Sequence, residues 1–351
     1  MDQLDEALQR IRCFGPERDG WLSNHAPMAV EALARHGHAA VIHRWLDGYA
    51  DRLEERPPGI EPIAADEWRD PLGDAVRTGD WLNYFDRELA DEPWRQVLAR
   101  WWPRLLPGIA AGATHGVIRV GHAVRALLDE ETVPRVGELG QGLAYWAARW
   151  QPLAPPGAGP YPAIDPRAAL DAVPRVPDQR FGIRARLAQL ADLPGWSAVA
   201  GAVPGRGAGS GKVADGPEAV PARLAGIVYA AITRHGTHGY AKPVMLVHAA
   251  TAPNAVLRTL PALPREIWPA SLAAGWAATA AITAAYAPAI GEPRPLLVAE
   301  QEAAEVMRLA VESADPHAIK FADTVLDAYA GTGDAALLAA SVRATEEIGP
   351  G

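Results

Sequence analysis

The chain has 351 residues, of which 49% are hydrophobic and 21% are charged, so it is long enough to bury a large core. Its formal net charge of -9 disfavours nucleic acid and anionic membranes as partners, because both bind basic surfaces. The single cysteine, Cys13, excludes an internal disulfide framework and an all-thiolate metal site. The acidic start also lacks the features of a secretory signal, and we expect a cytoplasmic protein.

Apolar residues recur at helical spacing along the chain, and proline and glycine separate the periodic stretches. The alternation typical of β-strands is missing. The pattern predicts an all-α fold, a large single-domain multi-helical bundle that spans residues 1–351. Helices are expected at about 3–13, 25–36, 38–55, 80–90, 94–106, 115–129, 135–150, 182–191, 219–235, 243–260, 265–287, 297–313, 316–330 and 334–347.

Three other stretches stand out from this pattern. Residues near 151–180 are rich in proline and residues near 204–217 are rich in glycine, which predicts surface loops. The second resembles a phosphate-binding loop, but Arg206 replaces a required glycine and Val213 stands where Ser or Thr is needed. The uncharged run 267–291 is rich in alanine and lacks basic flanks, which indicates a buried helix rather than a membrane span.

One helix start combines a histidine with an unusual lysine. Asp315 can cap the first amides, and Pro316 follows where a missing N–H costs nothing. His317 then lies in the first turn and Lys320 three residues later, so both side chains share one face. This spacing directs two ligands at one metal ion in helical carboxylate-bridged sites. Because the neighbours of Lys320 are apolar, the lysine is either snorkelling or functional.

Three further histidine segments are candidates for the same site. His25 and His115 each begin a helix, where the macrodipole favours the neutral imidazole that binds metals. His122 lies on the same helix face as His115, and His248 lies in an uncharged helix where it needs a hydrogen-bond partner or a metal. The residues alone leave open whether each histidine is a ligand or a hydrogen-bonded core residue.

The remaining histidines are weaker candidates. His36, His38 and His43 are expected at the surface or behind the ligands, and His235 and His238 are expected in a loose loop because glycines surround them. The twelve tryptophans are expected mostly in the core, although some could line an aromatic substrate pocket.

Together, these segments resemble the questin oxidase-like family, in the expected order and over most of the chain. The matching segments are Ser23 to Leu33, Trp45 to Tyr49, His115 to Leu127, His248 to Thr251 and Asp315 to Phe321.

The resemblance implies an enzyme of polyketide tailoring, a non-haem iron oxygenase that uses O2. Members oxidise anthraquinones and related polycyclic aromatics, by oxidative ring cleavage or by Baeyer–Villiger-type oxygen insertion. Some use four histidines and a carboxylated lysine as ligands, which here implies the set His25, His115, His248, His317 and Lys320.

Fungal members often carry histidine and tyrosine at the positions of Arg119 and His122, so the resemblance leaves open whether His115 or His122 is the ligand. It also allows NADPH as the electron source.

The implied chemistry agrees with the residue types. A neutral lysine amine reacts with carbon dioxide, and burial favours the neutral form. Imidazoles with a carbamate oxygen suit Fe2+, and also Mn2+ or Zn2+. Two rival hypotheses remain from the sequence: a metal-dependent hydrolase with a carboxylated lysine, and a non-catalytic helical protein that binds a small molecule.

Overall fold

The computed structural model describes residues 2–156, 165–204, 216–292 and 302–351. These residues form two compact units. The first comprises Met1–Pro152 with Pro261–Pro264, and the second comprises Leu153–Leu260 with Arg265–Gly351. Each unit is built almost wholly of helices, which confirms the all-α prediction. That 1–351 form a single domain stays a prediction.

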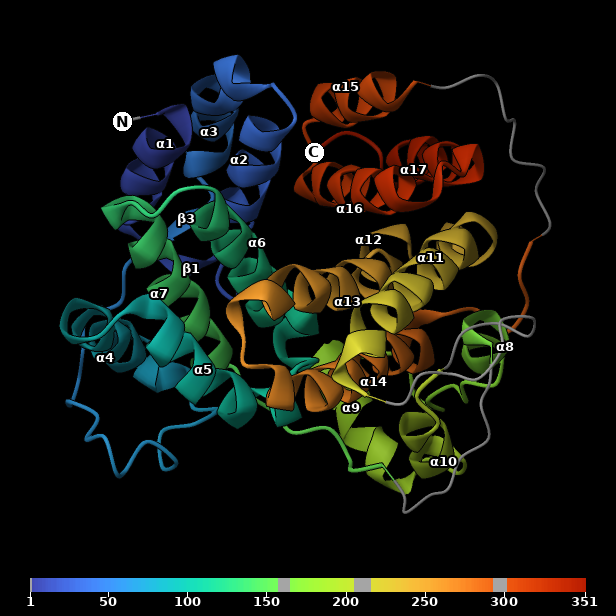
Figure 1. Cartoon of the computed structure of the whole chain (residues 1–351), viewed down its shortest axis with the longest axis horizontal. Coiled ribbons are helices and arrows are strands. Elements are labelled where there is room, and N and C mark those ends of the chain that lie inside the picture. The colour runs from blue at the N-terminus through green and yellow to red at the C-terminus, as the bar shows by residue number, and fades with distance from the viewer. Residues whose placement is uncertain (1, 157–164, 205–215, 293–301) are drawn as a thin grey trace. The chain divides into compact units, whose positions relative to one another are not determined.

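The first unit contains seven α-helices among its described residues, and α6 and α7 run side by side through it (Figure 1). Helix α7 also packs on α4, and α2 packs on both α1 and α6. Trp81, Phe85 and Trp101 pack ring against ring in the core. The helices are α1 (Gln3–Ile11), α2 (Ala26–Arg35), α3 (Ile42–Ala50), α4 (Thr78–Asp91), α5 (Trp94–Leu105), α6 (His115–Asp129) and α7 (Val133–Ala148).

A small antiparallel sheet accompanies these helices and was not predicted. Its strand order is β2-β1-β3, with bounds Leu22–Ser23, Phe14–Arg18 and Leu53–Glu55. The helix expected at 38–55 is therefore shorter: a 3-10 turn at Ala39–Val41 leads into α3, and the chain then enters β3. The strands are too short and too polar for their alternation to appear in the sequence.

The second unit is centred on α11, α13 and α14, while α15, α16 and α17 pack on one another (Figure 1). Alanine-rich α14 is buried along most of its length, as expected for the uncharged run. The helices are α8 (Pro166–Asp171), α9 (Ile183–Ala188), α10 (Trp196–Gly201), α11 (Val220–His238), α12 (Pro243–Leu246), α13 (His248–Thr259), α14 (Trp268–Tyr286), α15 (Ala303–Ser313), α16 (Pro316–Thr332) and α17 (Ala335–Ile348). Among the described helices, none combines the length and apolar character needed to cross a bilayer.

Two details of the second unit differ from the sequence interpretation, and one prediction lies outside the described residues. Helix α8 lies within the stretch expected to be irregular, because Asp165 caps it and Pro166 occupies its first turn. The single helix expected at 243–260 is two helices, α12 and α13, with Val247 between them. The loop expected at 204–217 falls mostly on residues 205–215, which lie outside the described residues.

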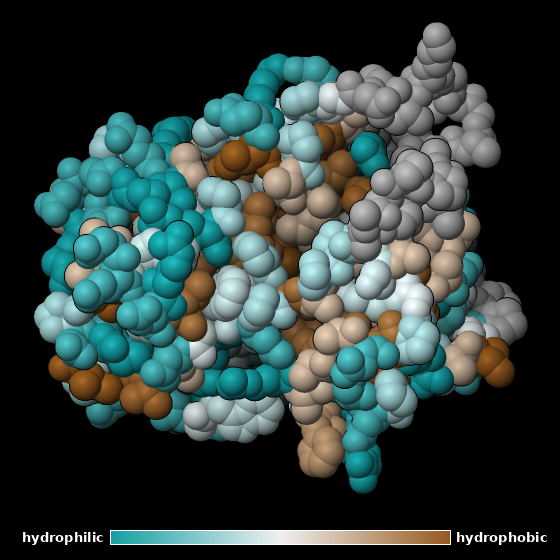
Figure 2. All heavy atoms as spheres, turned by 90° about the horizontal axis from the view of Figure 1, so that it is seen from below, coloured by the Kyte–Doolittle hydropathy of each residue, from teal (hydrophilic) through white to brown (hydrophobic). Residues whose placement is uncertain are grey.

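Polar residues cover much of the face in Figure 2, with apolar residues in separate patches between them. Most large apolar side chains are buried, among them Trp81, Trp101, Trp102, Trp146, Trp196 and Trp276. The prediction that most tryptophans belong to the core is therefore confirmed for these six.

Candidate functional site

The first unit brings two of the predicted ligands into contact. His25 immediately precedes α2, and His115 is the first residue of α6. Their Nε2 atoms lie 2.8 Å apart and their rings meet edge to face. Both are buried. These residues are 90 positions apart in the sequence, so the packing of α2 on α6 creates the pair.

The turn before α6 aims His115. Gly112, Ala113 and Thr114 have φ values of 55°, 55° and 67°, which reverses the chain just before the helix. Ala113 and Thr114 are not glycines, so their left-handed backbone conformation is strained. Strain of this kind often occurs at functional sites. The reversal lets His115 Nδ1 donate to the Gly112 carbonyl at 2.6 Å, so the lone pair of His115 is on Nε2.

Tyr49 and Arg18 hold the other ring of the pair. The Tyr49 hydroxyl lies 3.2 Å from His25 Nδ1 and accepts a hydrogen bond from the His25 backbone N–H, also at 3.2 Å. Arg18 Nε donates to the same Nδ1 at 3.4 Å. Burial raises the pKa of Tyr49 to about 12, so its hydroxyl keeps its proton and can donate or accept. Because Nδ1 accepts from Arg18, the proton of the neutral His25 ring lies on Nε2.

His122, the second candidate on α6, has different partners. Its Nδ1 lies 2.6 Å from Glu31, which also pairs with Arg125. Burial alone would raise the pKa of Glu31, but Arg125 and His122 lower it to about 2. Within the first unit, His25 therefore pairs with His115, and His122 belongs to a buried ionic cluster on the next turns of the same helix.

The second unit gathers the other three predicted ligands. The His248 and His317 rings lie 5.5 Å apart between centroids, at the starts of α13 and α16. Asp315 caps α16 as expected, with Oδ1 accepting from the His317 N–H at 2.7 Å. The same oxygen lies 3.2 Å from His317 Nδ1. His248 Nδ1 donates to the Met245 carbonyl at 3.1 Å.

Lys320 lies close to these histidines and is only 1% exposed. Burial lowers the pKa of His248 well below its ordinary value, and the positive charges of Lys320 and His317 lower it further. His248 is therefore neutral at pH 7, the form in which imidazole binds metals. The burial of Lys320 excludes the snorkelling interpretation, because its head group does not reach water.

Three of these imidazoles share an arrangement that suits metal binding. His115, His248 and His317 each direct Nδ1 to a fixed acceptor, which puts the lone pair of the neutral ring on Nε2. Metal-binding histidines are oriented in this way by partners behind them. Buried imidazoles oriented in this way could hold a metal ion.

Two carboxylates on α16, one of them buried, were not predicted from the sequence. Arg258 on α13 donates to Asp323 and Asp327 on α16, both at 2.7 Å, and Asp323 is fully buried. These bonds tie together the two helices that carry His248 and Lys320. The sequence shows that Asp323 and Asp327 follow Lys320 by three and seven residues and so lie near its helix face. It does not show that Arg258 on α13 is their partner.

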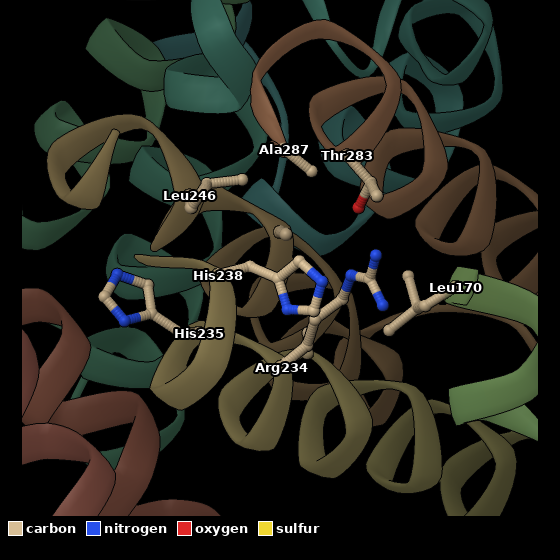
Figure 3. A pocket seen from close by; sticks show the side chains of 9 residues that line it. Leu170, Arg234, His235, His238, Leu246, Thr283 and Ala287 are labelled. Atoms are coloured by element: carbon tan, nitrogen blue, oxygen red, sulfur yellow. The ribbon is translucent and has the colours of Figure 1, made fainter. Parts of the chain in front are cut away.

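The weaker histidine candidates lie elsewhere. His36, His38 and His43 are partly exposed, and His43 bonds to Arg10. The loop expected around His235 and His238 is wrong, because α11 continues through both residues and buries His235. Both line a narrow hollow with Arg234, Leu170 and others (Figure 3), none of which is a predicted ligand. Figure 3 shows the side chains of Arg234 and His238 among those that line it.

The comparison with protein families agrees with this arrangement in the first unit. Residues 22–131 match the questin oxidase-like family. The match contains His25, Tyr49 and His115, and it confirms the resemblance predicted from the sequence. No curated protein matches the chain. The family implies an oxidase or oxygenase that acts on a small molecule.

Proposed function

We propose that this chain is a metal-dependent oxygenase that oxidises a polycyclic aromatic polyketide, such as an anthraquinone, by ring cleavage or Baeyer–Villiger-type oxygen insertion. Its ligands are His25, His115, His248, His317 and Lys320, its metal is Fe2+, and its co-substrate is O2. The observation that carries the proposal is the shared orientation of the buried imidazoles, in which Nδ1 is fixed and Nε2 is the ligand atom.

The His25–His115 pair supports this proposal because the donor and acceptor roles of its ring nitrogens can be assigned. Because His115 donates from Nδ1, its Nε2 accepts, and His25 Nε2 must donate to it across 2.8 Å. A metal held through both Nε2 atoms would require the His25 proton on Nδ1, where the Tyr49 oxygen can accept it once the Arg18 N–H no longer donates to that atom. The Tyr49 hydroxyl can serve either state, because a hydroxyl can both donate and accept.

Lys320 supports the proposal through its burial beside two imidazoles. A free ammonium next to a cation would repel it, whereas a carbamate would bind it through oxygen. In the carboxylation step the neutral Nζ adds to carbon dioxide: an N–C bond forms, one C=O π bond breaks and places its electron pair on oxygen, and the amine releases one proton to the solvent as CO2 enters. Lys320 is only 1% exposed, so water is excluded from its amine.

The metal would supply dioxygen activation, and the chain's own residues do the remaining work. Glu31 with Arg125, and Arg258 with Asp323, fix the helices that carry the ligands. The low pKa of His248 prevents its protonation from competing with metal binding.

Oxygen uptake with a hydroxylated anthraquinone tests the function. Protein reconstituted with Fe2+ without air should consume oxygen when the substrate is added, and Lys320→Ala should not. A labelled-carbon NMR signal from a carbamate should appear in the parent protein and be missing from Lys320→Ala. Oxygen uptake that is equal in both proteins would overturn the assignment of Lys320.

A further inference from the structure

Two buried polar side chains lie between α6 and α7 in the first unit. Arg119 is 2% exposed and Gln141 is 3% exposed. Arg119 donates to Glu138 through Nε at 2.5 Å and through Nη2 at 2.8 Å. This bidentate pair uses two of the three guanidinium nitrogens and neutralises the charge of Arg119.

Three polar atoms remain at this place. Arg119 Nη1 and both amide atoms of Gln141, Nε2 and Oε1, are buried and have no hydrogen-bond partner among the described residues. Buried polar atoms are almost always bonded, and each exception calls for an explanation. Each costs about 1–3 kcal/mol of stability. Proteins keep such a cost mainly where function requires it.

Helical spacing places Arg119 one turn after His115, a member of the histidine pair of the first unit. Gln141 follows Glu138 by three residues on α7, so it lies on the face that meets Arg119. Arg119 follows His115 by four residues on α6 and shares its face. The helices are close here, since a Cβ added at Gly142 would lie 3.5 Å from Arg119 Cγ.

The chemistry of the three atoms defines what would satisfy them. The Arg119 and Gln141 N–H groups need an oxygen acceptor, and Gln141 Oε1 needs a donor such as a hydroxyl. Because Glu138 already neutralises Arg119, a carboxylate or phosphate would add an uncompensated buried charge. A carbonyl next to a hydroxyl, as in a hydroxylated aromatic ketone or quinone, meets all three needs.

We infer that Arg119 and Gln141 determine substrate specificity by binding the carbonyl and hydroxyl oxygens of the aromatic substrate. The inference rests on the proposed function for the presence of an aromatic substrate. It adds the residues that recognise it and the oxygen pattern that they select.

Gln141→Leu tests the inference, with 1,8-dihydroxyanthraquinone and unsubstituted anthraquinone as probes in equilibrium dialysis against metal-free protein. The parent protein should prefer the hydroxylated probe, and Gln141→Leu should bind it roughly tenfold more weakly and lose the preference. The ligand-free variant should melt at a higher temperature than the parent, because a leucine leaves no unbonded polar atom. Gln189→Leu is the matched control, since Gln189 bonds to Asp178 through both amide atoms. It should lower the melting temperature and leave probe binding unchanged.

A paired variant tests Arg119 without leaving a lone buried charge. Arg119→Gln with Glu138→Gln keeps the site neutral and should weaken binding of both probes while metal content stays the same. Unchanged binding in Gln141→Leu, or no binding of either probe by the parent protein, would overturn the inference. If the parent protein binds the hydroxylated probe but consumes no oxygen after reconstitution with Fe2+, that result would count against the proposed function alone.

Discussion

The Tyr49 hydroxyl offers a sharp test of how His25 is held, because Tyr49→Phe removes a single oxygen atom. That oxygen accepts from the His25 backbone N–H and contacts His25 Nδ1, both at 3.2 Å. Its loss leaves a buried donor without an acceptor, which costs about 1–3 kcal/mol of stability. It also removes the oxygen that would accept the Nδ1 proton of His25 when Nε2 binds a metal, and changes of this kind weaken metal affinity roughly 10–100-fold.

Metal-buffered titration and urea unfolding of the metal-free protein separate these two effects. Tyr229→Phe is a suitable control, because its hydroxyl donates to Asp334 at 2.6 Å in the second unit and touches none of the predicted ligands. Both variants should lose stability, but only Tyr49→Phe should lose metal affinity. If Tyr49→Phe binds metal as tightly as the parent protein while it loses stability, then Tyr49 supports only the fold.

Three further predictions concern charge and capping. Glu31→Gln should destabilise the protein by about 3–5 kcal/mol in urea unfolding, because Arg125 would be left buried without its carboxylate; a loss below about 1 kcal/mol would contradict the role of this cluster. Asp315→Ala should cost about 0.5–2 kcal/mol through the lost helix cap and should weaken metal binding, whereas Asp315→Asn should keep the cap; equal behaviour of the two variants would refute this. Burial lowers the pKa of His235 from 6.5 to about 4. Between pH 6.5 and pH 4 the unfolded chain is therefore protonated at His235 while the folded protein is not. The free energy of unfolding falls as the pH drops through this range, by up to about 1.4 kcal/mol per pH unit. His235→Phe should reduce the stability difference between pH 7 and pH 4.5 by about 2–3 kcal/mol, and an unchanged difference would refute the assignment.

Local signals in the sequence predicted the helices well where a cap and a periodic face occur together. Asp315 and Pro316 predicted the start of α16, and the structure shows that cap. The same signal occurs at Asp165 and Pro166 and begins α8, but the surrounding prolines indicated a loop. Glycines around His235 likewise predicted a loop, yet burial of that side chain against the rest of the unit extends α11 through it.

Contacts between distant residues could not be read from the sequence. Tyr49 is 24 residues from His25, and Glu31 is 91 residues from His122. Helical spacing shows which residues share a face, but which faces meet depends on how the helices pack. The family resemblance supplied the set of ligands, and the hydrogen bonds at each Nδ1 show how His115, His248 and His317 are oriented.

Metal content is the most direct test of the central claim that the buried histidines and Lys320 bind a metal. Protein reconstituted with Fe2+ in the absence of air and then desalted should retain the metal in a fixed ratio to protein, measured by elemental mass spectrometry. His115→Ala and His248→Ala, one from each unit, should both lose it, while His43→Ala at the surface should not. A parent protein without bound metal, or both variants with the full ratio, would contradict the account.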